Sequence, residues 1–251
     1  MSNRLSLPKL NNIKYAYIQF YTTTAIRILF MSLLPKMLIA SMLLSPFANA
    51  VQAKMVNEVF NGDMLGTTQR YFESIAGIPR KSSGNEHSFR VQGCNITATI
   101  DNNDVSALRM ELNDKCQADL STFIDSYTPP ANTPLTVGAF EFDNFTFMAD
   151  CLSLCGNAAD PSVFALWEGP RATNFIEVLL EFKLVGDAAL DAADEWEELM
   201  KKAAGEDYIM ETRFNCDDRF NTQGYNAFKN VTPTAITIGH GLSTPRSDCA
   251  K

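Results

Sequence analysis

The chain has 251 residues, with 21 basic and 29 acidic side chains and a formal net charge of −8. Five basic residues and no acidic residue lie in residues 1–50, so residues 51–251 keep 16 basic and 29 acidic side chains, a net charge of −13. A body this acidic argues against nucleic acid and anionic membranes as partners, because both are negatively charged.

The first 50 residues have the composition of a targeting segment. Lys36 precedes a short apolar run, residues 37–47, and Ala48-Asn49-Ala50 is a small-x-small cleavage motif. The apolar run is shorter than the roughly 20 residues of a membrane-spanning helix. We therefore predict a signal peptide cleaved after Ala50, which leaves a periplasmic or extracellular body with no stable membrane span. A mitochondrial transit peptide is the alternative, but the run is apolar all round and not amphipathic.

All six cysteines of the chain lie in the predicted body. They are Cys94, Cys116, Cys151, Cys155, Cys216 and Cys249. An even number of cysteines in an exported chain indicates a disulfide framework. Proximity along the chain favours the pairs Cys94–Cys116, Cys151–Cys155 and Cys216–Cys249. The body is long enough to bury a core without them, so we expect the disulfides to reinforce the fold.

Residues 55–127 are predicted to form a first α+β module. Thr67 is expected to cap a short helix that ends at Ala76, before Gly77-Ile78-Pro79. The expected buried face of this helix consists of Tyr71, Phe72, Ile75 and Ala76. From residue 89 to residue 112 apolar and polar side chains alternate, with a turn at residues 101–104. This pattern predicts two or three antiparallel strands joined by hairpins.

Residues 128–134 are rich in proline and are predicted to be a linker to a second module, residues 135–251. Asp160 is a suitable N-cap and Pro161 a suitable first helical residue, so a helix is expected through Trp167. It would end at Gly169-Pro170. Residues 176–184 alternate as a long strand, with Glu177, Glu181 and Lys183 on the face toward water.

A long helix is predicted over residues 188–204, with Asp187 as its cap and Gly205 as its stop. Its acidic residues come early and its lysines late, which suits the helix macrodipole. The expected apolar stripe consists of Leu190, Ala193, Trp196, Met200 and Ala203. Residues 208–216 alternate as a further strand, and residues 235–238 are predicted to form the last one.

The two halves share an outline, in which a short capped helix, a Gly-Pro-Arg stop and strands follow one another. The stops are Gly77-Ile78-Pro79-Arg80 and Gly169-Pro170-Arg171. This outline resembles the tandem modules of β-lactamase inhibitory proteins and of small outer-membrane assembly lipoproteins. The resemblance implies an α+β fold of two helix-plus-antiparallel-sheet modules. Residues 151–161 also look like a segment of uncharacterised exported bacterial proteins, which implies a compartment and no activity.

The sequence shows no catalytic, cofactor-binding or metal-binding motif. His240 and Ser243 lack the Gly-x-Ser-x-Gly turn of a nucleophile elbow. The spacing of Cys151 and Cys155 is one residue longer than a Cys-x-x-Cys redox site, and a zinc site needs more ligands. We therefore predict no catalytic residue, cofactor or metal.

These observations favour an exported, acidic, non-enzymatic binding protein. A more specific hypothesis is an inhibitor or immunity-type protein that acts on a basic secreted or cell-wall enzyme, because opposite charge accelerates association. On charge alone, the predicted contact residues are Asp191, Asp194, Glu195 and Glu198. Two alternatives stay open: a carboxylate-dependent secreted hydrolase and a structural envelope component.

Overall fold

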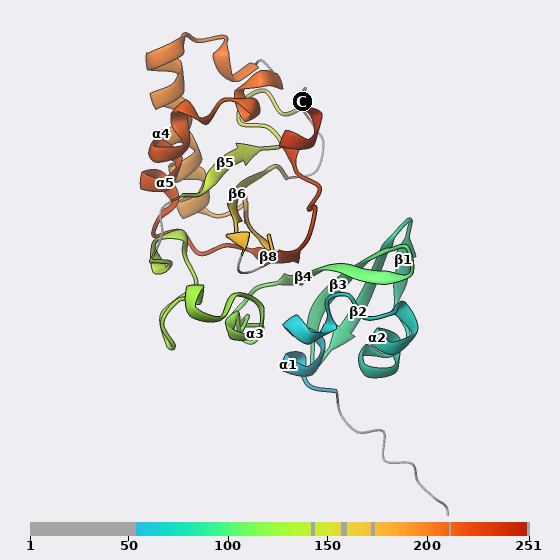
Figure 1. The fold of residues 1–251 in the computed structure, drawn as a ribbon. Helices are drawn as coiled ribbons and strands as arrows, with labels where there is room; N and C mark the ends of the chain where they lie inside the picture. Colours follow the sequence, from blue (N-terminus) through green and yellow to red (C-terminus); the bar gives the residue numbers. More distant parts are fainter. Residues whose placement is uncertain (1–53, 142–143, 157–159, 172–173, 211, 250–251) are drawn as a thin grey trace, which may run out of the picture. The chain divides into compact units, whose positions relative to one another are not determined.

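The computed structural model describes residues 54–141, 144–156, 160–171, 174–210 and 212–249 (Figure 1). The described residues from Lys54 onward belong to one compact unit. The predicted signal peptide and its cleavage site after Ala50 lie outside the described residues. Within the described part of the chain, no helix combines the length and the apolar character needed to cross a membrane.

The strands of the described residues form one antiparallel sheet in the order β1-β2-β3-β4-β8-β7-β6-β5. Their bounds are β1 Lys81–Ser83, β2 Glu86–Val91, β3 Cys94–Asp101, β4 Asp104–Glu111, β5 Thr146–Ala149, β6 Ser162–Glu168, β7 Glu177–Lys183 and β8 Ala235–Gly239. The last strand in the sequence, β8, pairs with both β4 and β7. It therefore joins the strands of both predicted modules in a single sheet. The α+β prediction is confirmed, and the division into two modules stays a prediction.

Helices from both halves cover the same face of this sheet. The α-helices of the described residues are α1 Val56–Val59, α2 Gln69–Ala76, α3 Ser121–Ile124, α4 Asp187–Ala204 and α5 Asn221–Phe228, of which α2, α4 and α5 contact the sheet through aromatic rings. Figure 1 shows α4 and α5 beside β5, and α2 beside the sheet formed by β1 to β4. The ring of Phe72 on α2 lies 5.2 Å from that of Phe89, and the ring of Trp196 on α4 lies 6.0 Å from that of Phe147.

A continuous apolar row explains why one face is covered. Cross-strand pairs run from β2 to β5 through Phe89, Ile96, Met110, Ile236, Leu180, Ala165 and Phe147. All seven side chains are buried. Because partners directly opposite in an antiparallel sheet point to the same face, Phe89 and Phe147 share one core although they lie at opposite ends of the row.

The expected helix from Pro161 to Trp167 is wrong, because this segment is strand β6. Val163, Ala165 and Trp167 are buried toward the helices, and Phe164 points to the other face with Ser162. Because both faces of β6 carry apolar side chains, its sequence does not show the alternation of apolar and polar residues that marks a strand. Pairing with β5 and β7 outweighs the capping signal of Asp160 and Pro161. Gly169-Pro170-Arg171 therefore follows a strand and not a helix.

The expected strand at residues 208–216 is also wrong. Two 3₁₀ helices, Tyr208–Met210 and Thr212–Cys216, replace it. The backbone hydrogen bonds are local, from Tyr208 N–H to Gly205 O and from Met210 N–H to Asp207 O. Further 3₁₀ turns are Gly62–Met64, Asp125–Tyr127, Val137–Ala139, Asp218–Phe220 and Pro245–Asp248. The sequence patterns predicted neither β5 nor α5.

The position of α2 is confirmed, but its cap is Thr68 and not Thr67. The Thr68 hydroxyl accepts a hydrogen bond from the Tyr71 backbone N–H, whereas the Thr67 hydroxyl donates to the Met64 carbonyl. Phe72 and Ala76 are buried, as expected. Tyr71 was expected in the core and is 51% exposed, because it lies on the side of the helix away from the sheet.

Helix α4 ends at Gly205 as predicted, but it begins one residue earlier than expected. Gly186 is its N-cap, so Asp187 lies in the first turn, where a carboxylate stabilises the helix dipole. Its buried stripe consists of Ala189, Ala192, Ala193, Trp196, Glu197 and Met200. Leu190, expected in this stripe, is 40% exposed, and Ala203 is also exposed.

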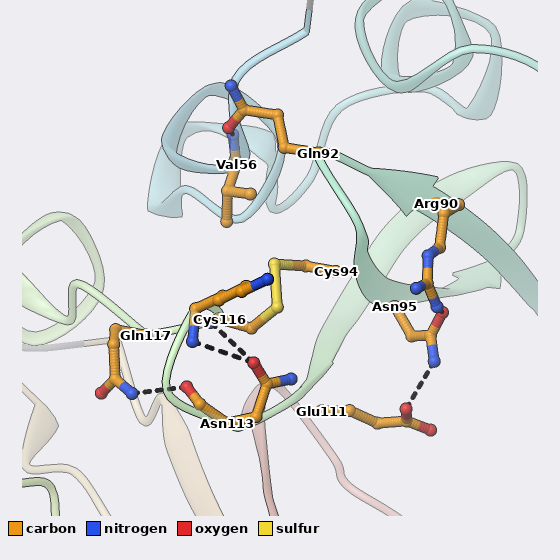
Figure 2. Close-up of a disulfide and its surroundings, with 10 residues drawn as sticks. Val56, Arg90, Gln92, Cys94, Asn95, Glu111, Asn113, Cys116 and Gln117 are labelled. Atoms are coloured by element: carbon orange, nitrogen blue, oxygen red, sulfur yellow. Dashed lines mark hydrogen bonds between the residues drawn. A yellow bond between two sulfur atoms is a disulfide. The ribbon is translucent and has the colours of Figure 1, made fainter.

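The three predicted disulfides are confirmed, each with a Cα–Cα distance of 5.6 Å. Cys94–Cys116 joins the start of β3 to the segment that follows β4, as Figure 2 shows. The Asn113 side-chain oxygen accepts a hydrogen bond from the Cys116 backbone N–H and fixes that segment. A framework of disulfides fits an exported protein, since such bonds persist in oxidising compartments.

Candidate functional site

The face of the sheet turned away from the helices carries a connected row of polar side chains. At one end, an Arg90 guanidinium N–H donates to Asn95, and the Asn95 amide donates to Glu111 over 2.5 Å (Figure 2). Glu111 also lies 3.8 Å from the Arg109 guanidinium. The row thus links β2, β3 and β4 through charged and amide groups.

Arg109 extends the row across the middle of the sheet. Its Nη2 lies 2.7 Å and its Nε 3.2 Å from Glu181 Oε2 on β7. The other oxygen of Glu181 accepts a hydrogen bond from the Ser162 hydroxyl on β6. The side chains of Arg109 and Glu181 are 33% and 19% exposed, so the pair is largely shielded from water.

The pair can cross β8 because β8 presents only small side chains on this face. They are Ala235, Thr237 and Gly239, as the strand register shows. Gly239 is required sterically, since a Cβ there would collide with the Ser106 carbonyl oxygen. The small residues leave a hollow, which we call the sheet groove, with a volume of about 200 Å³. Its lining is Glu86, Thr97, Thr99, Ala107, Arg109, Phe164, Leu179, Glu181, Thr237, His240, Gly241, Leu242 and Ser243.

The segment after β8 turns over the sheet and forms the rim of this groove. The His240 backbone N–H donates to the Ser106 carbonyl, and the Leu242 backbone N–H donates to Glu177 Oε2 over 2.6 Å. Glu177, placed by the sequence on the water-facing side of its strand, therefore holds a loop. This role depends on a contact between residues 65 positions apart.

A larger hollow adjoins the sheet groove and shares Phe164 and Ser243 with it. We call it the disulfide pocket, because one wall is the loop closed by Cys151–Cys155. Its volume is about 530 Å³. The lining consists of Ala149, Asp150, Cys151, Leu152, Ser153, Phe164, Ile209, Met210, Phe214, Asn215, Ser243, Thr244 and Pro245.

Asp150 is the charged side chain among the residues that line the disulfide pocket. Packing around its carboxyl group raises the pKa of Asp150, although the residue as a whole is exposed at the rim. A hydrogen bond from the Ser162 backbone opposes this rise in the pKa, and repulsion from Glu181 adds to it. The carboxylate is thus held by the backbone, and no lysine, arginine or histidine lies among the described residues that line the pocket.

The predicted contact residues Asp191, Asp194, Glu195 and Glu198 are all exposed on α4. Glu197, between them, is buried and forms an ion pair with Lys201. Since α4 packs on the core face of the sheet through Trp196, these carboxylates belong to the helix layer. The structure does not bring them together with the sheet groove.

Sequence reasoning identified Glu181 as water-facing, but it missed the pairing with Arg109 and both hollows. The strand alternation placed both residues on the polar side, and only the order of the strands shows that they meet. His240 and Ser243 both line the sheet groove and both are exposed. Within the described ranges, no group of three or more His, Cys, Asp or Glu side chains is arranged to hold a metal ion.

Comparisons of the chain with protein-family models, with curated proteins and with solved structures found no match.

Proposed function

We propose that this protein is an exported, acidic binding protein without catalytic activity, which captures a basic secreted or cell-wall enzyme as an inhibitor or immunity-type protein does. The observation that carries the proposal is the polar row on the open sheet face. Arg90, Asn95, Glu111, Arg109 and Glu181 are bound to one another. Side chains held in one arrangement lose little conformational entropy on binding, which favours recognition.

Charge supports the same proposal. The predicted body has a net charge of −13, and the exposed carboxylates of α4 add a negative field along one helix. Such a field attracts a basic partner and raises the association rate, with a strong dependence on ionic strength. In this proposal, the long-range attraction comes from Asp191, Asp194, Glu195 and Glu198. The open face of the sheet makes the direct contact with the partner.

The test is capture of a partner from the envelope extract of the host, using the tagged full chain. A basic protein should be recovered, and its association rate should fall by about tenfold or more between about 50 and about 500 mM salt. Recovery of no basic protein, or a rate that does not change with salt, would contradict the proposal.

A matched pair of variants separates α4 from total charge. One replaces Asp191, Asp194, Glu195 and Glu198 by their amides, and the other makes the same change at Asp63, Asp104, Asp114 and Glu141, which are also exposed. Both remove four negative charges. The first should slow association several-fold more than the second, with similar dissociation rates. Equal effects would show that α4 has no special role.

A further inference from the structure

The walls of the disulfide pocket are held by covalent and bidentate contacts. Cys151–Cys155 closes the loop on one side, and Cys216–Cys249 holds the C-terminal segment that supplies Thr244 and Pro245. At its inner side, the buried Asn215 amide exchanges two hydrogen bonds of 2.9 Å with the backbone of Ala149. The pocket is therefore preformed, and a ligand would enter it at a small entropic cost.

The lining combines apolar and neutral polar side chains, and its described residues carry a single charge. Leu152, Phe164, Met210 and Phe214 supply aliphatic and aromatic surface, and Asp150 supplies the charge. No lysine, arginine or histidine stands among the described residues of the lining. A carboxylate beside apolar side chains, with no cation among them, matches an occupant that is itself apolar along its length and positive at its end.

We propose that the disulfide pocket binds a lysine or arginine side chain that the basic partner presents, with its methylene stem against Phe164 and Met210 and its charged head at Asp150. This inference rests on the proposed function and adds the anchoring contact. Lysine and arginine commonly place their stems along apolar surface and keep the charge at a polar edge. A pocket of about 530 Å³ is large enough for such a side chain together with part of its neighbours.

The electrostatics favour a cation over a neutral apolar occupant. The pKa of Asp150 is raised by burial and by Glu181, so the ionised carboxylate is destabilised in the free protein. A neutral side chain in the pocket would remove more water from that carboxylate and leave it unpaired, which is unfavourable. An ammonium or guanidinium group would instead supply the missing opposite charge.

The experiment is an NMR titration of the full chain, with its disulfides intact, against Nα-acetyl-lysine methylamide. The uncharged Nα-acetyl-norleucine methylamide is the matched probe, since it keeps the stem and lacks the ammonium group. We expect the lysine probe to shift the amide resonances of Asp150, Ser153 and Met210 and to bind about tenfold or more tightly than the norleucine probe.

Four variants test the assignment of the contacts. Asp150→Asn should weaken the lysine probe at least about tenfold and leave the norleucine probe unchanged. Phe164→Ala should weaken both probes. Asp160→Asn is the control, because Asp160 forms an ion pair with Lys183 and does not line the pocket, so it should change neither. Met210→Ala, at a 51% exposed residue, tests the stem contact with little risk to folding.

Equal binding of the two probes, or no effect of Asp150→Asn, would overturn the inference. Partner capture separates this failure from that of the proposed function. If the Asp150→Asn variant captures the basic partner with unchanged affinity, the proposed binding function stands. The inference that the disulfide pocket anchors the partner is then wrong. If the lysine probe binds as expected but no basic partner is captured, the pocket stands and the proposed function is wrong.

Discussion

Arg109 on β4 and Glu181 on β7 form an ion pair across β8, with Nη2 and Oε2 2.7 Å apart, although the residues lie 72 positions apart in the chain. The pair connects strands of the two predicted modules on the polar face of one sheet. Both side chains also line the sheet groove.

Replacing Arg109 by methionine should destabilise the protein, because Glu181 would keep its charge in a largely shielded position and lose its cation. We expect the free energy of unfolding to fall by about 1–3 kcal/mol, as for hydrogen bonds to charged groups. Urea denaturation measures this change. Arg90→Met is the control, since Arg90 is exposed and should cost less than about 1 kcal/mol. Equal losses in both variants would contradict the special role of the Arg109–Glu181 pair.

Asn215 protects the outer edge of the sheet. Its side chain forms hydrogen bonds with both the backbone N–H and the backbone carbonyl of Ala149 on the edge strand β5. A further strand beside β5 would otherwise pair with these two groups. Asn215→Leu should leave two buried backbone groups unpaired and lower the free energy of unfolding by at least about 2 kcal/mol. It should also increase aggregation, because an open strand edge pairs with other chains. Denaturation and light scattering measure the two effects.

Asn221→Leu is a graded comparison for Asn215→Leu. Asn221 accepts one hydrogen bond, from the Phe147 backbone N–H on the same strand. Asn221→Leu should lower the free energy of unfolding by about half as much as Asn215→Leu, since it leaves one backbone group unpaired instead of two. A decrease in the free energy of unfolding as large as that of Asn215→Leu would contradict this explanation of how β5, the edge strand, is protected.

Gly224→Ala should destabilise the protein, against the usual preference of helices for alanine. Alanine in a helix interior is normally more stable than glycine by about 0.5–1 kcal/mol. A Cβ at Gly224 would lie 2.6 Å from Cγ of Phe147, so α5 would have to move from β5. We expect a net loss of about 1–3 kcal/mol by thermal unfolding. Asn226→Ala, exposed on the same helix, should be neutral or stabilising, and Phe147→Leu should partly rescue Gly224→Ala.

Acid should weaken the contact between Asp218 and Arg246. The hydrogen bond from Arg246 lowers the pKa of Asp218, so folding favours the ionised carboxyl. The ionised carboxyl therefore stabilises the folded protein fully above about pH 3.9, the ordinary pKa of an aspartate. This stabilisation is lost as the pH falls through the lower pKa of Asp218 in the folded state. Asp218→Asn should have a lower melting temperature than the parent near neutral pH. That difference should shrink below about pH 4.

Melting temperatures between about pH 7 and about pH 2.5 test this expectation. Arg246→Met should show the same loss and the same pH dependence, because it removes the other partner of the ion pair. If the difference in melting temperature between variant and parent stays constant across this pH range, Arg246 is not the cause of the lowered pKa of Asp218.

Local patterns in the sequence determined the features that neighbouring residues control. The hairpin between β3 and β4 follows from alternation and from Asn102 and Asn103, which take the positive φ angles of a tight turn, 51° and 72°. Gly205 ends α4 with a φ of 106°, and each disulfide joins the cysteine nearest in the chain. In each of these features the interacting groups are close in sequence, so their spacing is visible there.

Only the tertiary structure decided the sheet order and the surfaces that depend on it. Asp160 and Pro161 predict a helix where the structure has strand β6, and the identity of this strand comes from pairing with β5 and β7. The insertion of β8 between β4 and β7 brings Arg109 to Glu181 and places residues of all three strands around the sheet groove. Periodicity states which face of a strand is apolar, but not which strand lies beside it. That choice is made by packing and hydrogen bonding between residues far apart in the chain.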